Sequence, residues 1–177
     1  AQAQEPQCGF CSLGLSCRNC VMGPCRLDPF GEGPQRGICG ADADIIVARN
    51  LARMIAAGAA SHSDHGRDLV ETLLAVAEGQ APGYQLTDLA KLDRVAAEYG
   101  LAADLPPQAK AKELALAMMA EFGIHKGHLT FTKRLPAARL ELWHRLNIAP
   151  RGIDREVVET MHRTHMGVDN DAVNILL

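Results

Sequence analysis

Residues 8–39 read CGFCSLGLSCRNCVMGPCRLDPFGEGPQRGIC and contain all six cysteines of this 177-residue chain. Glycines and prolines recur between the cysteines, and such a composition sustains neither long helices nor strand ladders. We therefore expect residues 1–40 to form irregular loops around a bound group that takes the place of a hydrophobic core.

From residue 41 onward the sequence pattern becomes helical. Apolar residues recur at helical spacing between capping or stopping residues, which predicts helices at 42–55, 69–79, 89–100, 107–122, 136–146 and 154–165. Asp42 or Asp44 is expected to cap the first helix, and Asp154 the last. The first helix is apolar on most sides, so we expect it to be buried.

The predicted fold class is mainly α. An irregular Cys/Gly-rich cluster-binding segment, residues 1–40, is expected to precede a helical bundle, residues 41–177. A brief run at Leu129–Thr132 is the one segment with strand periodicity. The chain begins without Met and ends in an apolar stretch, so we expect it to be a piece of a longer polypeptide, truncated at its C-terminus.

Charge and composition argue against two kinds of partner. The net charge is −3, the pI is about 6.2, and no basic stripe accumulates, so we expect no nucleic-acid binding. No apolar run reaches the roughly 20 residues that span a bilayer, and the first residues lack the features of a signal peptide. We therefore expect a cytoplasmic protein without membrane insertion.

The cysteine spacing is compatible with three kinds of site. A disulfide framework needs an oxidising compartment, and nothing in the sequence indicates export. Structural zinc could use the first two Cys-x2-Cys pairs, but it would leave Cys25 and Cys39 unexplained. A cubane iron–sulfur cluster needs four thiolates, which one short loop and one remote cysteine can supply. The residues that fit this last arrangement are Cys17, Cys20, Cys25 and Cys39.

Cys8 and Cys11 remain after that assignment, and two thiolates complete neither of the common cluster types. Two copies of the chain that meet on a twofold axis would supply four ligands to one shared cluster, which predicts a homodimer. The alternative is that this pair is a reactive or disulfide-forming dithiol.

Several longer motifs resemble a known family, the anaerobic nickel–iron–sulfur carbon-monoxide dehydrogenases. The similarity is to the N-terminal cluster-binding and helical domain, which is well under half of the family's catalytic subunit. The motifs are CRNCVMGPCR at 17–26, GICGADAD at 37–44 followed by Ile45–Arg53, AGAASHSDHG at 57–66, GIDRE at 152–156 and MHRTHMGVDND at 161–171.

The resemblance implies roles for all six cysteines. Cys17, Cys20, Cys25 and Cys39 match the ligands of the B-cluster, a [4Fe–4S] relay, and Cys8 matches a ligand of the D-cluster shared across the homodimer axis. Ser16 stands where one common pattern of the family has a second D-cluster cysteine. Cys11 instead forms a Cys-x2-Cys pair with Cys8, a variant that implies a [2Fe–2S] rather than a [4Fe–4S] D-cluster.

The resemblance also implies a proton path. His62 matches the histidine that the family places near the nickel site as an acid–base group, and His65 resembles the next histidine of the path. Asp68 and Glu71 stand at two further positions of that path. Release of two protons during CO oxidation makes a group that titrates near neutrality useful. The alternative is that both histidines are helix-start surface residues.

The other histidines are assigned no catalytic role. His162 and His165 are one turn apart without a third ligand, which favours packing or hydrogen bonding over a metal site. Residues 169–171 read DND but lack the remaining ligands of a calcium loop, so we expect a helix cap. We expect surface positions for His125, His128 and His144.

The function implied is that of the electron-exit part of a carbon-monoxide dehydrogenase, an oxidoreductase that converts CO and water to CO2, two protons and two electrons. No cysteine follows Cys39, so the ligands of the nickel–iron–sulfur C-cluster would lie outside this chain. Electrons would pass through the B-cluster and D-cluster to a ferredoxin-like acceptor. The alternatives are a zinc-ordered helical interaction module and a short electron-transfer subunit that serves a separate catalytic protein.

Overall fold

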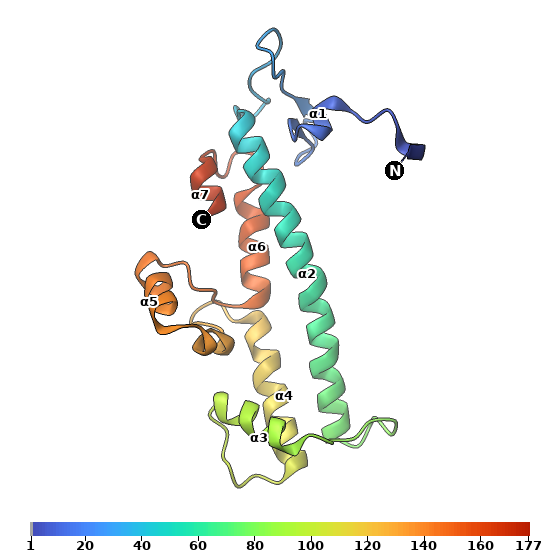
Figure 1. The fold of residues 1–177 in the computed structure, drawn as a ribbon, viewed down its shortest axis with the longest axis vertical. Helices are drawn as coiled ribbons and strands as arrows, with labels where there is room; N and C mark the ends of the chain where they lie inside the picture. Colours follow the sequence, from blue (N-terminus) through green and yellow to red (C-terminus); the bar gives the residue numbers. More distant parts are fainter. Residues whose placement is uncertain (1) are drawn as a thin grey trace. The chain divides into compact units, whose positions relative to one another are not determined.

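The computed structural model describes residues 2–177, and these residues are mainly α-helical, as predicted (Figure 1). The α-helices are α1 (Gly9–Ser12), α2 (Ala43–Ala77), α3 (Leu89–Glu98), α4 (Pro107–Gly123), α5 (Ala137–Leu146), α6 (Ile153–Arg163) and α7 (Ala172–Leu176). Two 3-10 helices, η1 (Gln2–Gln4) and η2 (Thr130–Arg134), and the antiparallel strands β1 (Ser16–Cys17) and β2 (Cys25–Arg26) complete the list.

A single helix of 35 residues, α2, replaces the two helices that were expected at 42–55 and 69–79. The intervening sequence is rich in alanine and has no proline. Its two glycines, Gly58 and Gly66, each cost only about 1 kcal/mol in a helix. Asp42 caps the helix, because its side chain accepts a hydrogen bond from the backbone N–H of Ile45 at 3.1 Å. Gly79 follows the last turn in the left-handed conformation, which glycine adopts without strain.

The expectation that the start of α2 is buried on all sides is wrong. Ile46 is fully buried, but Val47 and Leu51 are each 44% exposed and Met54 is 68% exposed. The buried residues of the helix instead follow one stripe, as helical periodicity dictates for one packed face. They are Ile45, Ile46, Ala48, Arg49, Ala52 and Ala56.

Two further expectations about local structure are wrong. The run at Leu129–Thr132 forms no strand; Thr130–Arg134 is a 3-10 helix in which the hydroxyl of Thr132 donates to the carbonyl of Leu129 at 2.7 Å. Asp154 does not cap α6, because the helix begins at Ile153 and Asp154 lies in its first turn. The side chain of Asp154 instead accepts a hydrogen bond from Arg67 at 2.6 Å.

The chain divides into two compact units. Unit 1 extends to Gly58 and adds Val157–Leu177, and unit 2 is Ala59–Glu156. The expected functional division at residue 40 is a separate matter and stays a prediction.

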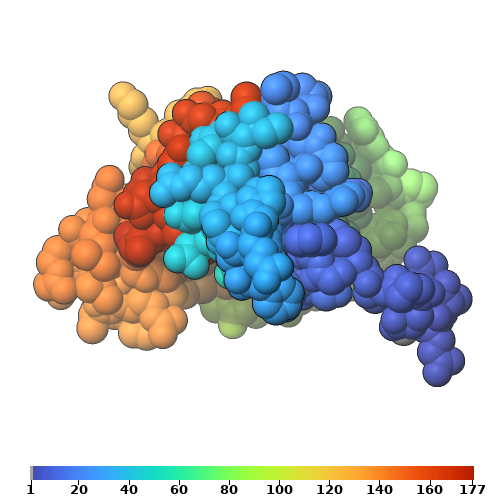
Figure 2. Space-filling model, turned by 90° about the horizontal axis from the view of Figure 1, so that it is seen from above, coloured from blue at the N-terminus to red at the C-terminus, as the bar shows by residue number. Residues whose placement is uncertain are grey.

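Unit 1 packs the cysteine-rich segment against the start of α2 and the end of the chain (Figure 2). Its core contains side chains from all three parts. The amide of Asn50 on α2 donates to the carbonyls of Gly14 and Ser16 at 3.2 Å each, which ties the first loops to the helix. The core residues are Cys17, Leu27, Ala41, Ile45, Ile46, Ala48, Ala52 and Ile175.

Unit 2 is built on the packing of α3 against α4, with Leu92, Ala111 and Leu114 at its centre. Pro107 opens α4 at a first-turn position that needs no backbone donor, as predicted. The buried Lys110 pairs with Asp93 at 2.5 Å and donates to the carbonyl of Ala103 at 2.9 Å. Within residues 2–177, no helix has both the length and the apolarity needed to cross a bilayer.

Candidate metal centre

The β1–β2 ribbon brings two cysteines face to face. Cys17 pairs with Cys25, and Ser16 pairs with Arg26, in the antiparallel register. The pairing continues beyond the strands, because the N–H of Leu27 donates to the carbonyl of Leu15 at 3.0 Å. Residues directly opposite in such a ladder carry their side chains on the same face.

Four cysteines line one pocket in unit 1, and they are the four that the spacing grouped together: Cys17, Cys20, Cys25 and Cys39. Cys17 is buried and the other three are half-buried. Ala41 and Ile46, both buried, form part of the apolar wall. The structure therefore places these thiols around a common space that is shielded from water on the side of α2.

Glycines allow the backbone to approach these thiols closely. A Cβ atom at Gly37 would lie 3.4 Å from both Cβ and Sγ of Cys25. A Cβ atom at Gly23 would lie 3.0 Å from the carbonyl oxygen of Cys17. The N–H of Ile38, next to Gly37, points at the Cys25 Sγ at 3.5 Å. Backbone donors near a thiolate stabilise its negative charge.

Arg49 reaches the fourth thiol from α2. Its Nη1 donates to the Sγ of Cys39 at 3.4 Å. Burial raises the pKa of the Cys39 thiol, but the hydrogen bond from Arg49, the N–H of Ala41 and the charge of Arg49 lower the pKa by more. The pKa of Cys39 therefore lies below its ordinary value, which favours the thiolate, the form that binds metal.

Two buried N–H groups at this pocket have no partner among the described residues. They are the Nδ2 of Asn19 and the Nε of Arg49, and both residues line the pocket with the four cysteines. An unsatisfied buried donor costs about 1–3 kcal/mol. Donors of this kind fit an anionic group held by the four thiols.

The four thiols line one pocket from separate parts of the cysteine-rich segment. Within the described part of the chain, no three His, Cys, Asp or Glu side chains are grouped so that they could hold one metal ion. Four thiols spread around one pocket match the larger core of a [4Fe–4S] cluster.

Cys8 and Cys11 form a separate pair at the surface. Both are exposed, and neither lines the pocket of the other four cysteines. Cys8 precedes the first turn of α1, and Cys11 lies within it. The backbone N–H and the side chain of Cys11 lower the pKa of Cys8. All six cysteines are free of disulfides.

The two histidines of the expected proton path lie well inside α2 rather than at a helix start. His62 and His65 are both exposed and belong to unit 2, as do Asp68 and Glu71, which are exposed as well. Beside them, Arg67 pairs with Asp64 at 3.0 Å. The role of this group in proton transfer stays a prediction.

His125, His128 and His144 occupy exposed positions, as expected. His162 and His165 are exposed as well, and their expected role in packing or hydrogen bonding stays a prediction. His128 and His144 contact each other edge to face, with ring centroids 4.4 Å apart, a pairing that the sequence did not reveal. Asp171 caps α7 by accepting a hydrogen bond from the N–H of Asn174 at 3.0 Å, which confirms the helix cap expected at 169–171.

Arg49 and Asn19 were not singled out from the sequence. The sequence contained a signal that Arg49 is buried, because its position follows the helical spacing of the apolar residues Ile45, Ile46 and Ala52. A charged residue at such a position is almost always paired. Asn19 lies inside a Cys-x2-Cys motif and carries no comparable signal.

Comparison with known proteins identifies a family and a relative to which this chain is similar. Residues 15–177 match the model of the Prismane/CO dehydrogenase family. The chain is 60% identical to carbon monoxide dehydrogenase 1 of Methanosarcina acetivorans over 177 residues, which is 99% of this chain but 28% of that protein. The chain therefore spans between a quarter and a third of the length of this relative.

Solved structures of proteins named carbon monoxide dehydrogenase are similar to this chain as well. A crystal structure of Ni-free carbon monoxide dehydrogenase from Thermococcus sp. AM4 superposes with a TM-score of 0.93 at 52% identity, covering 99% of this chain and 28% of that one. A structure of acetyl-CoA synthase/carbon monoxide dehydrogenase described by its NiZn[Fe4S4] and NiNi[Fe4S4] clusters has a TM-score of 0.91 at 38% identity. It covers 98% of this chain and 26% of that chain.

Proposed function

Because the chain belongs to the Prismane/CO dehydrogenase family, we propose that it is the N-terminal, electron-exit part of an anaerobic carbon-monoxide dehydrogenase. The overall reaction is CO + H2O to CO2 + 2 H+ + 2 e−. Since the chain covers 28% of a relative that carries this name, the nickel–iron–sulfur C-cluster would be held by the rest of the enzyme. We place the enzyme in the cytoplasm.

The observation that carries the proposal is the pocket lined by four thiols and two unpartnered N–H donors. Cys17, Cys20, Cys25 and Cys39 would hold a [4Fe–4S] B-cluster, which supplies one-electron transfer when bound. This chain contributes an apolar wall that limits access of water, and N–H groups that offset the negative charge. Both features suit an electron relay, because they lower the energy needed to reorganise the surroundings.

Cys8 and Cys11 would supply half of the D-cluster on the twofold axis of a homodimer. Their exposure at the start of α1 supports this, because a half-site must be open to a second copy. The resemblance of the Cys8-x2-Cys11 pair to a variant of the family favours a [2Fe–2S] cluster here over a [4Fe–4S] cluster. Electrons would leave from this point to a ferredoxin-like acceptor.

His62 would serve as an acid–base group for the protons released in CO oxidation, and His65 would continue the path. Both imidazoles are exposed on the same helix, one turn apart. Their exposure in this chain supports the proposal, since the side chains are free to meet a site completed by the rest of the enzyme.

Metal analysis tests the proposal directly. Protein purified without oxygen should contain about four iron atoms and four acid-labile sulfides for the B-cluster, plus the share of each chain in the D-cluster. Zinc without sulfide would overturn the proposal and indicate a zinc-ordered interaction module instead. A stable complex with a separate nickel-containing catalytic protein would indicate a short electron-transfer subunit.

A further inference from the structure

Arg49 is a charged residue buried where helical packing calls for an apolar one. Its exposed fraction is 1%, and it lies on the same stripe of α2 as Ile46 and Ala52. Burial of an arginine without compensation is unfavourable by several kcal/mol. Arg49 must therefore form favourable polar interactions with its surroundings that offset the cost of burying its charge.

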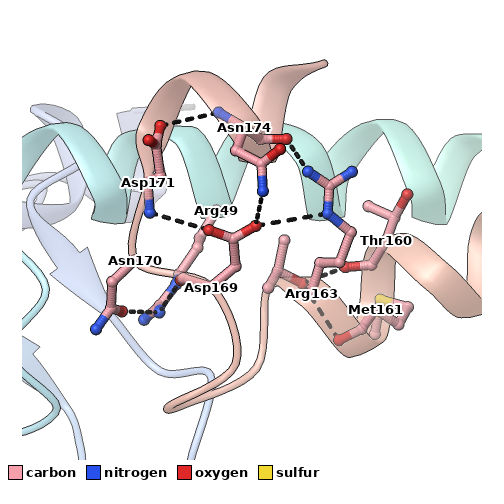
Figure 3. A network of polar contacts seen from close by, with 9 residues as sticks. Arg49, Thr160, Met161, Arg163, Asp169, Asn170, Asp171 and Asn174 are labelled. Atoms are coloured by element: carbon pink, nitrogen blue, oxygen red, sulfur yellow. Dashed lines mark hydrogen bonds and ion pairs between the residues drawn. The ribbon is translucent and has the colours of Figure 1, made fainter. Parts of the chain in front are cut away.

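The end of the chain holds the guanidinium in place (Figure 3). Nη2 of Arg49 donates to the carbonyl of Asp169 and to the Oδ1 of Asn170, at 2.7 Å each. The Asp169 carboxylate is occupied elsewhere, with Nδ2 of Asn174 at 2.6 Å and Nε of Arg163 at 3.6 Å. The two bonds of Nη2 fix the orientation of Arg49, but neither of them neutralises its charge.

The only acidic group that Arg49 contacts among the described residues is the Cys39 thiol, at 3.4 Å from Nη1. No carboxylate within residues 2–177 forms an ion pair with Arg49. Its Nε borders the four-cysteine pocket without a partner, as does the Nδ2 of Asn19. The positive charge and both free donors are thus available to whatever the thiols hold.

We propose that Arg49 is a positioning residue that orients the Cys39 thiolate and, with Asn19, raises the reduction potential of the [4Fe–4S] cluster. This inference rests on the proposed function. The reduced cluster carries one more negative charge than the oxidised cluster. A fixed cation and nearby N–H donors therefore stabilise the reduced form more strongly, which raises the potential.

The test is a redox titration of the relay cluster, monitored by electron paramagnetic resonance, in the full-length enzyme purified without oxygen. In Arg49→Met, the ratio of reduced to oxidised cluster at a fixed solution potential should fall about tenfold, the effect of losing one charge-assisted hydrogen bond. Tenfold corresponds to about 59 mV for a one-electron couple. Arg49→Lys keeps the charge and should recover part of the shift.

Arg53→Met is the matched control. Arg53 lies one turn further along α2, and its Nη1 donates to the hydroxyl of Thr164 at 3.1 Å without lining the cysteine pocket. This variant should keep the wild-type potential. An equal shift in Arg53→Met, or an unchanged potential in an Arg49→Met protein that retains its cluster, would overturn the inference.

If Arg49→Met loses the cluster, its reduction potential cannot be measured, and a third variant tests the inference instead. Asn19→Ala removes the second donor and leaves the bonds of Arg49 and Cys39 intact, so its cluster should form with a lower potential. A wild-type potential in Asn19→Ala would then refute the inference. Wild-type protein without iron and sulfide would refute the proposed function itself, before any potential is compared.

Discussion

Cys17 and Cys25 are direct partners across the β1–β2 ribbon. Both belong to the four cysteines that line the pocket of unit 1. The pairing holds their side chains on one face of a two-stranded ladder, at a separation of about 5 Å between Cβ atoms. Gly23 lies between the strands of this ribbon and allows the chain to turn close to the Cys17 carbonyl. The ribbon therefore prepares part of the site before any metal binds.

Replacement of Cys25 by serine should remove the relay cluster. The iron and sulfide content should fall by about four atoms each per chain, because three thiolates hold a cubane cluster poorly. Chemical assays for iron and acid-labile sulfide measure this loss. A full complement of both in Cys25→Ser would contradict the assignment of Cys25 as a ligand.

The double variant Cys8→Ser/Cys11→Ser should lose the shared cluster but keep the relay cluster, since neither cysteine lines the pocket of the other four. Dissociation of the dimer should become easier, because two ligands from each copy no longer join the chains. Iron analysis and sedimentation velocity measure the two effects. An unchanged iron content would show that these cysteines form a dithiol and not half of a cluster.

His62→Ala should lower kcat for CO oxidation by about a hundredfold or more in the full-length enzyme, the usual effect of removing a general acid–base group. Its iron content should remain normal, because the exposed side chain makes no contact with the cysteine pocket. His144→Ala, also exposed, is the control and should keep wild-type activity. Normal kcat in His62→Ala would exclude His62 from the proton path.

Gly152→Ala should destabilise unit 2 by about 1–3 kcal/mol. A Cβ atom at the buried Gly152 would overlap the backbone carbonyl of Ile124, so the backbone itself would have to move. Gly58→Ala is the matched control, because nothing lies within 4 Å of its added Cβ in the interior of α2. That variant should be more stable by about 0.5–1 kcal/mol. Urea denaturation followed by circular dichroism compares the two, and equal stabilities would contradict the prediction.

Glu156 should contribute stability at neutral pH that disappears in acid. Burial raises its pKa, but hydrogen bonds from the side chain and the backbone N–H of Arg151, together with the charge of Arg151, lower the pKa by more, with a further contribution from Arg155. A pKa that folding lowers stabilises the protein above the unfolded value, and this stability is lost as the pH falls through the folded value. The carboxylate of Glu156 accepts from Arg151 at 2.9 and 3.1 Å.

The pair is more than one-third exposed, so solvent screening limits its contribution to about 1 kcal/mol or less. Glu156→Gln should therefore unfold more easily than the wild type at pH 7, and the difference should shrink as the pH falls below the ordinary pKa of a glutamate, about 4.3. Denaturation curves at a series of pH values measure this. A difference that stays constant across the series would contradict the assigned cause.

Much of the site could be predicted from the sequence because the information is local. Four cysteines within a short Cys/Gly-rich segment group together by spacing alone, and the structure places all four thiols around one pocket. Helix boundaries at Pro107 and the cap at Asp171 were predictable for the same reason. The continuity of α2 between residues 55 and 69 was not predicted, because this stretch has few large apolar residues at helical spacing, although its alanines favour a helix.

The contacts of Arg49 could be known only from the tertiary structure. Residues 169 and 170 lie more than one hundred positions away from Arg49, and no local pattern joins them to α2. Side chains distant in the chain meet because the apolar stripe of α2 buries Ile175 together with the cysteine segment. The cysteine spacing thus determined which four thiols gather at one pocket, whereas long-range packing decided which charge and which donors surround them.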